Sequence, residues 1–191
     1  MKHLTGFLAL FLCVFVPLQA ADLSDLTWTT TDGEVTVIDC DKAATGELII
    51  PDTIEGNPVT SIGDSAFEGC DRLKSITIPD SVTSIGTYAF FGCSSLTSIA
   101  IPDSVTSIGV RAFAVCRNLT SITIPDGVTS IGGLSFEACN HLTAVRFLGD
   151  APKAGREVFN GSTPTIYRKP EAKGWGDTFA GRPVKLISEK P

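Results

Sequence analysis

The chain has 191 residues, 43% of them hydrophobic, which is enough for one ordinary domain with a substantial core. Charge is uneven along it: residues 21–145 hold five Lys or Arg and sixteen Asp or Glu, whereas residues 146–191 hold nine and five. The acidic body disfavours nucleic acid as a partner, because such binding needs a basic surface. We interpret the basic tail as a solvated face.

Residues 1–20 have the pattern of a secretory signal peptide. Lys2 supplies the positive start, residues 4–16 the apolar stretch, and Leu18-Gln19-Ala20 the cleavage site. The apolar stretch is too short to span a bilayer core of about 30 Å. We therefore expect cleavage after residue 20, secretion or display on the cell surface, and no membrane span in the mature chain.

The next feature is a repeat. IPDSVTSIG occupies residues 78–86 and 101–109, and IPDGVTSIG occupies residues 124–132. The same interval of 23 residues separates the members of three columns: Phe67, Phe90, Phe113 and Phe136; Cys70, Cys93, Cys116 and Cys139; and Leu73, Leu96, Leu119 and Leu142. A unit this short cannot bury its apolar side chains alone, so copies must stack and make each column a continuous internal ridge. The repeat predicts a solenoid.

Within one unit, alternation predicts which side chains point inward. Ile76, Thr77 and Ile78 form a strand-like run with the isoleucines inside, and Pro79 ends it. VTSIG predicts a second extended piece whose glycine serves either a positive φ or tight packing. AFEGC, residues 66–70, predicts a single helical turn with its phenylalanine inward. Successive strands then pair in parallel, about 4.8 Å apart.

The patterns L-x-x-I-x-I-P, V-x-x-I-G and A-F-x-x-C resemble the BspA-like class of leucine-rich repeats over about residues 46–148. The resemblance implies a right-handed solenoid of α/β class, secreted or surface-displayed, with a binding role. Two copies depart from the pattern. Five extra residues lie between Ile50 and Gly63, and Ser135 replaces alanine in the copy from residue 132. Terminal repeats are commonly atypical, so both departures indicate transitions into caps.

Four segments follow from these patterns: a signal peptide at 1–20, an N-terminal β-hairpin cap at 21–49, a solenoid of four to five coils at 50–148, and a C-terminal cap at 149–191. Alternation around Asp32-Gly33 predicts the hairpin, which would cover the open edge of the first coil. An independent ligand module is the alternative for the last segment. There we expect five side chains to cover the last coil: Phe159, Ile166, Tyr167, Trp175 and Phe179.

Five cysteines remain after cleavage, namely Cys40 and the column of four. Export permits disulfides, and neighbouring coils would bring column Cα atoms within bridging range. Stacked side chains point in parallel, however, which suits the disulfide dihedral angle poorly. We therefore favour buried thiols, with disulfides as the alternative, and the spacing indicates no zinc site.

Asp80, Asp103 and Asp126 form an acidic column directly after the strand proline. Calcium bound between coils is one interpretation. The other is that each carboxylate caps its own turn by accepting a hydrogen bond from the backbone. Unit charges 5 Å apart repel by only about 0.8 kcal/mol in water, and a hydrogen bond to a charged group returns about 1.5–3 kcal/mol. We favour capping and predict neither a metal nor a cofactor.

Catalytic groups are scarce. His141 is the only histidine after cleavage, and a Cys139–His141 dyad is the one nucleophile and base arrangement that the sequence offers. Cys139 belongs to the inward column, however, and a buried structural thiol is inert. We therefore predict that the protein is not an enzyme.

The remaining candidate site is the outer surface of the strands. Its predicted binding face consists of Lys74, Thr77, Thr97, Thr120, Thr123, Thr143 and Arg146. This face is rich in hydroxyl groups and lacks the aromatic anchors common at interfaces. A further threonine row comprises Thr60, Thr83, Thr106 and Thr129. Asn118 and Asn160 begin glycosylation triplets, which matter only in a host that glycosylates.

These observations predict a secreted, non-catalytic protein-interaction or adhesion module whose ligand is a protein or a glycan surface. Four alternatives remain: a structural component of the cell surface, a module stabilised by calcium, a glycan or ice binder that uses the threonine rows, and a hydrolase.

Overall fold

The computed structural model describes residues 21–187. The elements in chain order are η1 (Leu23–Asp25), β1 (Leu26–Thr31), β2 (Glu34–Cys40), β3 (Gly46–Ile49), β4 (Thr53–Ile54), β5 (Asn57–Ile62), β6 (Leu73–Thr77), β7 (Ser84–Ile85), β8 (Ser98–Ala100), β9 (Ser107–Ile108), β10 (Ser121–Ile124), β11 (Ser130–Ile131), β12 (Ala144–Phe147), β13 (Lys153–Ala154), β14 (Thr165–Arg168), β15 (Thr178–Phe179) and β16 (Arg182–Leu186).

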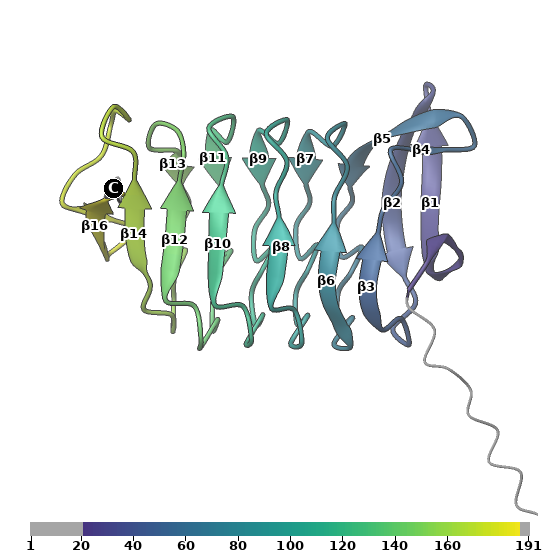
Figure 1. Ribbon diagram of the computed structural model, residues 1–191, viewed down its shortest axis with the longest axis horizontal. Helices are drawn as coiled ribbons and strands as arrows, with labels where there is room; N and C mark the ends of the chain where they lie inside the picture. The colour runs from purple at the N-terminus through teal and green to yellow at the C-terminus, as the bar shows by residue number, and fades with distance from the viewer. Residues whose placement is uncertain (1–20, 188–191) are drawn as a thin grey trace, which may run out of the picture.

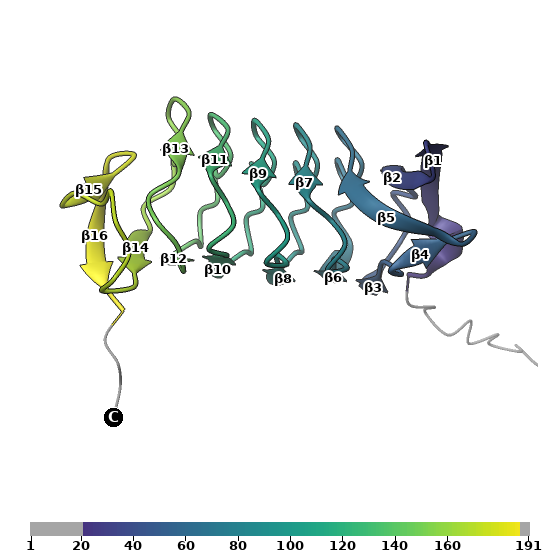
Figure 2. The ribbon, with the colours of Figure 1, turned by 90° about the horizontal axis from the view of Figure 1, so that it is seen from above.

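The strands lie in rows along a solenoid (Figure 1). One row is the sheet β1-β2-β5-β7-β9-β11-β13, to which β4 is attached. A second row holds the sheets β3-β6-β8 and β10-β12-β14-β16-β15, end to end. Figure 2 shows the two rows on opposite sides of the molecule. We call the outward side of β3, β6, β8, β10, β12, β14 and β16 the front face.

Strand register confirms the predicted repeat. Ile76 of β6 pairs with Ile99 of β8, and Ser84 of β7 pairs with Ser107 of β9, each one repeat further along the chain. Both pairings are parallel, as expected for a solenoid whose coils lie one strand spacing apart. The described antiparallel pairs are β1–β2, β4–β5 and β15–β16.

The predicted columns form the core. The rings of the phenylalanine column stack with centroid separations of 5.1, 5.2 and 5.4 Å and interplanar angles of 10° or less. Every phenylalanine, cysteine and leucine of the three columns is buried. The stack also continues beyond residue 148, because Phe159 stacks on Phe136 at 5.6 Å and β13 pairs with β11. Phe159 and the buried Ile166 therefore belong to the stack and not to a covering layer.

At the N-terminal end, β1 and β2 form the predicted hairpin, with Thr31 paired to Glu34 across Asp32-Gly33. β2 also pairs in parallel with β5, and β3 with β6, so a coil of the solenoid already begins within residues 34–49. The five extra residues of the first repeat form the β4–β5 hairpin, whose turn places Glu55 and Gly56 at positive φ.

The segments expected as single helical turns are non-helical, and η1 is the only helix among residues 21–187. Ser65 and Gly69 have φ of 56° and 73°, a left-handed conformation that cannot continue a right-handed helix. The turn instead donates along the stack, from Phe67 N to Ala89 O at 2.7 Å and from Gly69 N to Phe91 O at 2.7 Å. The left-handed positions recur every 23 residues: Ser65, Tyr88, Arg111, Leu134 and Glu157; and Gly69, Gly92, Val115, Ala138 and Gly161.

The glycine that ends VTSIG serves tight packing. A Cβ added to Gly109 would lie 2.4 Å from the carbonyl carbon and oxygen of Gly86 in the preceding coil. Gly86 and Gly132 are equally crowded, and none of the three has a positive φ. Of the two roles that the sequence left open, the close approach of neighbouring backbones is therefore the one found.

All five cysteines of the described residues are free and buried, in agreement with the interpretation as thiols. Cys93, Cys116 and Cys139 donate from Sγ to the carbonyl oxygens of Phe67, Phe90 and Phe113 at 3.1, 3.2 and 3.0 Å. Burial raises the pKa of all three thiols, that of Cys139 to about 12. The column thus adds a ladder of S–H···O contacts inside the core.

The C-terminal end is closed by aromatic side chains. Trp175 and Phe179 pack on Phe147 with ring centroids 4.9 and 5.3 Å away, and Trp175 Nε1 donates to Gly149 O at 3.2 Å. These two residues cover the end of the stack as predicted. Tyr167 does not: it is half-buried, and the Arg146 guanidinium lies over its ring.

We predict that Ile108→Asp abolishes folding or costs several kcal/mol, because it buries a charge with no partner at a position only 2% exposed. Thr123→Asp introduces the same charge at an exposed strand position and should cost less than about 1 kcal/mol. Urea unfolding followed by circular dichroism measures both. Equal losses would contradict the assignment of inner and outer positions.

Gly109→Ala should destabilise the protein by several kcal/mol, because the new methyl group forces two backbones apart. The matched control is Gly69→Ala, where φ is +73° and no atom lies within 4 Å of the added Cβ. That change should cost only about 1–2 kcal/mol for the left-handed conformation. Denaturation midpoints compare the two variants, and a larger loss at Gly69 would refute the packing role of Gly109.

Alkaline pH should destabilise the fold through the buried thiols. The Cys139 thiol has a pKa of about 12 when folded and an ordinary value of 9.0, so the unfolded chain loses this proton first. Its contribution is present below pH 9 and falls as the pH rises from 9 towards 12, by about 1.4 kcal/mol per pH unit. Cys139→Ala should make the decline in unfolding free energy shallower by that amount. Parallel declines in the variant and the parent would contradict this assignment.

Candidate interaction surface

The front face carries a central row of outward side chains, one from each strand. Register places Thr77 beside Ala100 in β6 and β8, and Thr123, Arg146, Tyr167 and Lys185 beside one another in β10, β12, β14 and β16. Ile49, on β3, pairs with Thr77 and is 70% exposed. Of the predicted binding face, the row contains Thr77, Thr123 and Arg146.

Three members of this row were not found from the sequence, namely Ile49, Tyr167 and Lys185. Tyr167 follows Arg146 by 21 residues and Thr77 follows Ile49 by 28, so neither pair keeps the interval of 23. The Arg146 guanidinium lies 6.0 Å from the Tyr167 ring centroid. The expectation of a face without an aromatic side chain is therefore wrong at this end.

The threonine rows serve the solenoid. Thr97 and Thr143 donate from Oγ1 to the carbonyl oxygens of Lys74 and Thr120 in the preceding coil, both at 3.2 Å. In the second row the hydroxyl groups of Thr83, Thr106 and Thr129 donate to the carbonyl of the preceding threonine at 3.2–3.3 Å. These hydroxyl protons are already used within the fold. The oxygens of these five hydroxyl groups are left as acceptors for an external glycan or ice lattice.

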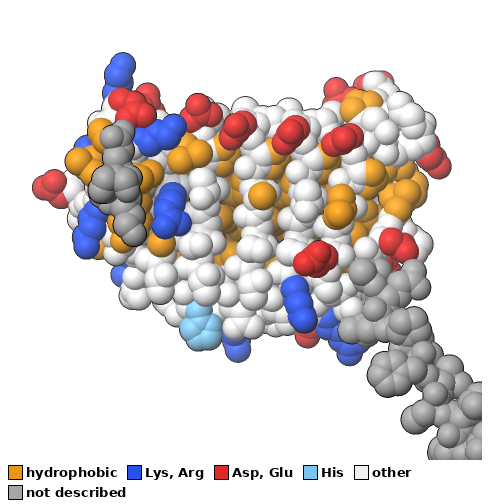
Figure 3. Space-filling model, viewed as in Figure 1, with side chains coloured by type: hydrophobic (Ala, Val, Ile, Leu, Met, Phe, Trp, Pro, Cys, Tyr) orange, Lys and Arg blue, Asp and Glu red, His pale blue; other side chains and the backbone are white. Residues whose placement is uncertain are grey.

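An acidic column borders the front face. Asp80, Asp103 and Asp126 follow β6, β8 and β10 and are exposed. Figure 3 shows a row of acidic side chains along the upper edge of this face. The expected side-chain caps are not formed: the described residues give these carboxylates no hydrogen bond, and the turn closes through Val82 N to Pro79 O at 3.1 Å and its equivalents. Within residues 21–187 no group of three or more His, Cys, Asp or Glu is placed to hold a metal ion.

A shallow groove of about 540 Å³ opens beside this column. It is lined by Thr77, Ile78, Asp80, Ala100, Ile101, Pro102, Asp103 and Ser104. A second depression of about 290 Å³, towards β10, shares Ala100 and Ile101 with it. The side chain of Ala100 is smaller than its neighbours Thr77 and Thr123, which leaves Ile99 and Ile101 each 8% exposed.

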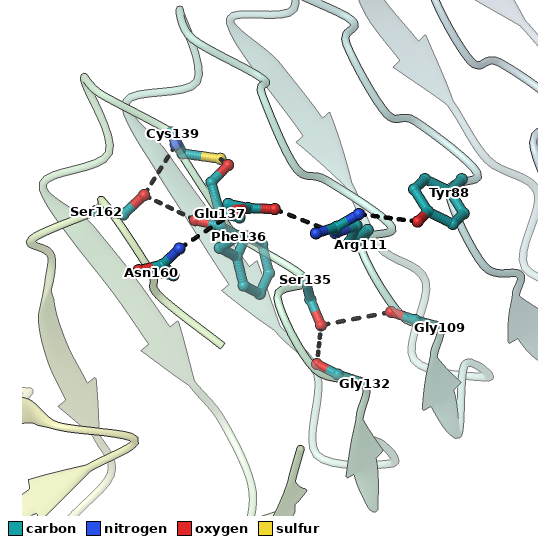
Figure 4. Close-up of polar contacts among 10 residues, drawn as sticks. All are labelled: Tyr88, Gly109, Arg111, Gly132, Ser135, Phe136, Glu137, Cys139, Asn160 and Ser162. Carbon is teal, nitrogen blue, oxygen red and sulfur yellow. Dashed lines mark hydrogen bonds and ion pairs between the residues drawn. The ribbon is translucent and has the colours of Figure 1, made fainter. Parts of the chain in front are cut away.

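In the left-handed turns, a row of polar side chains links four coils (Figure 4). Arg111 donates from Nη1 to the Tyr88 hydroxyl at 3.0 Å, its Nε lies 3.1 Å from Glu137 Oε2, and Asn160 Nδ2 donates to Glu137 Oε1 at 3.3 Å. The hydrogen bond that Arg111 donates to Tyr88 raises the pKa of Arg111, which therefore stays charged. Asn160 and Asn118 are both exposed. These contacts fasten neighbouring coils together.

The considered Cys139–His141 dyad is not assembled. Cys139 is fully buried and donates its thiol proton to Phe113 O, whereas His141 is exposed. The raised pKa of Cys139 keeps the thiol protonated at neutral pH, which removes its nucleophilic form. Among the described residues, no helix is long and apolar enough to cross a membrane.

Comparison with known proteins agrees with this architecture. Residues 46–165 match the model of the BspA type leucine rich repeat region, in six copies. The chain is similar to a leucine-rich repeat protein of T. pallidum, with 27% identity, 78% of this chain and 71% of that chain covered, and a TM-score of 0.70. It is also similar to a leucine-rich repeat protein from Bacteroides capillosus, with 34% identity, 64% and 94% covered, and a TM-score of 0.57.

A leucine rich cell surface protein from Faecalibacterium prausnitzii also aligns, with 25% identity, 78% of this chain and 54% of that chain covered, and a TM-score of 0.49. The comparison with curated proteins finds no match. The family match covers more than half of the chain and coincides with the stacked coils. The chain therefore belongs to the BspA-type leucine-rich repeat family.

Proposed function

We propose that this protein is a non-catalytic interaction module that binds a protein ligand on its front face. Leucine-rich repeat proteins generally bind other proteins. A solenoid suits that role, because its outer residues can vary while its inner columns keep the fold. The front face is extended and presents side chains from the strands of two sheets, in register within each sheet.

The observation that carries the proposal is the groove at Ala100. Its floor is apolar, with Ile78, Ile101 and Pro102, and Asp80 and Asp103 stand at its rim without a hydrogen-bond partner among the described residues. A lysine or arginine side chain suits such a site, because its aliphatic part covers apolar surface while its charge meets a carboxylate. We therefore assign the groove to a basic side chain of the ligand.

The other end of the front face has the opposite character. Arg146, Tyr167 and Lys185 lie side by side there, and Leu186 next to them is 52% exposed. Arginine and tyrosine are among the residues that most often dominate binding energy. Figure 3 shows basic side chains gathered at this end, away from the acidic column. Two regions of opposite charge on one face would orient a ligand along the solenoid.

The proposed place of action is outside the cytoplasm. The signal-peptide pattern at residues 1–20 supports export, although those residues lie outside the described part of the chain. Secretion or surface display, and a role in adhesion, both belong to this proposal. Use of the threonine rows for glycan or ice binding is less well supported, because the hydroxyl protons of Thr83, Thr97 and Thr106 are donated to backbone carbonyls.

Panning the full chain against a library of displayed peptides tests the proposal. We expect enriched peptides to contain Lys or Arg, and Asp103→Asn to weaken their binding roughly tenfold, which corresponds to about 1.4 kcal/mol. Asp126→Asn is the matched control, because Asp126 is in the same column but does not line the groove. Its effect should stay within about twofold.

A glycan array is run beside the peptide library. Retention on glycans with no peptide enriched would overturn the protein-ligand proposal in favour of glycan binding. Binding to neither peptides nor glycans would overturn the proposal in favour of a structural component of the cell surface. Equal losses in the Asp103 and Asp126 variants would remove the groove from the proposal.

A further inference from the structure

The thiol ladder changes at its N-terminal end. Cys93, Cys116 and Cys139 each donate to a phenylalanine carbonyl at 3.0–3.2 Å. Cys70, the first member of the column, faces no such phenylalanine. Its Sγ instead lies 3.8 Å from the carbonyl oxygen of Cys40, the last residue of β2. The end of the hairpin thus brings a second cysteine to the end of the ladder.

Cys40 and Cys70 are also close enough to influence each other's ionisation. Cys40 Sγ lies 3.7 Å from the carbonyl oxygen of Asp41, and the interaction between the two thiols raises the pKa of Cys40 and lowers that of Cys70. The positive charge of Lys42 lowers the pKa of Cys70 further. The three later thiols show the opposite shift, because burial raises the pKa of each. Cys70 therefore forms a thiolate more readily than the rest of the column, with a second thiol beside it.

We propose that Cys40 and Cys70 form a disulfide when the chain meets a disulfide oxidant, and that this bond fastens the N-terminal hairpin to the repeats. The Cys70 thiolate attacks one sulfur of the oxidant and releases its other sulfur as a thiol. The Cys40 thiolate then displaces the remaining half of the oxidant from the mixed disulfide. The two cysteines lose two protons and two electrons, and the oxidant becomes two thiols.

The position of Cys40 and Cys70 at the end of the stack favours their oxidation over that of the other thiols. Cys40 is 1% exposed and Cys70 is fully buried, so the oxidant gains access only when the β1–β2 hairpin moves away. Terminal elements open more easily than the middle of a stack. Cys116 and Cys139, by contrast, are enclosed by coils on both sides. The disulfide would close a loop across β3, β4 and β5 and so oppose loss of the hairpin.

Peptide mapping tests the proposal on the parent chain. The protein is incubated with oxidised and reduced glutathione, denatured, alkylated and digested with trypsin without a reductant. In the chain from residue 21 onward, cleavage after Lys42 and Arg72 places Cys40 and Cys70 on adjacent peptides, with no other cysteine on either. We expect these two peptides to be joined, about 2 Da lighter than their sum, and Cys93, Cys116 and Cys139 to be alkylated.

Stability provides a second measurement. Oxidation should raise the Tm of the parent and of Cys93→Ala by about 5–15 °C, and should leave the Tm of Cys70→Ala unchanged. Cys93→Ala is the matched control, since Cys93 is the next member of the column. Recovery of Cys40 and Cys70 as alkylated peptides after oxidation would overturn the proposal, as would a bridge between two members of the column. Both outcomes are independent of ligand binding.

Discussion

The whole structure depends on keeping neighbouring coils one strand spacing apart. Backbones can approach that closely only where no side chain intervenes, which is the role of the glycine column represented by Gly109. The same spacing lets phenylalanine rings stack at 5.1–5.6 Å and lets threonine hydroxyl groups and cysteine thiols reach the carbonyl groups of the preceding coil. The contacts along every column therefore depend on the spacing between neighbouring coils. A substitution that widens this spacing at one coil weakens the contacts of every column there.

The two ends of the stack meet different constraints. At the N-terminal end a β-hairpin pairs with the open sheet edge, so the backbone groups of β2 are satisfied on both sides. At the C-terminal end Trp175 and Phe179 cover Phe147, and the short β15–β16 pair closes the last coil. The hairpin at one end and the aromatic cover at the other leave no open coil on which a further repeat could stack. The N-terminal device also places Cys40 beside Cys70, which is why a proposed disulfide belongs there.

The fold is fixed by the inner columns, so the outward side chains of the front face can differ from coil to coil. These differences create the proposed binding site. One alanine among threonines opens the groove at Ala100, and the neighbouring acidic column supplies charge to it. Arg146 and Tyr167 meet at the other end through register between β12 and β14. The proposed ligand site thus needs no cofactor or catalytic group, only side chains held at fixed intervals by a rigid stack.

The sequence by itself determined every feature that follows from equal spacing. Residues 23 apart must stack, so the burial of Phe67 and its equivalents and the parallel register could be predicted. The tertiary structure alone decided what depends on the path of the chain where that interval changes. Tyr167 departs from the interval by two residues, and Cys40 lies beside Cys70 across an insertion. Phe159 does keep the interval, and only the altered composition of its segment hid its place in the stack. The tertiary structure also decided where the left-handed turns lie and which carbonyl groups accept hydrogen bonds from the threonines. A backbone dihedral angle and a hydrogen-bond partner depend on the adjacent coil and not on residue type.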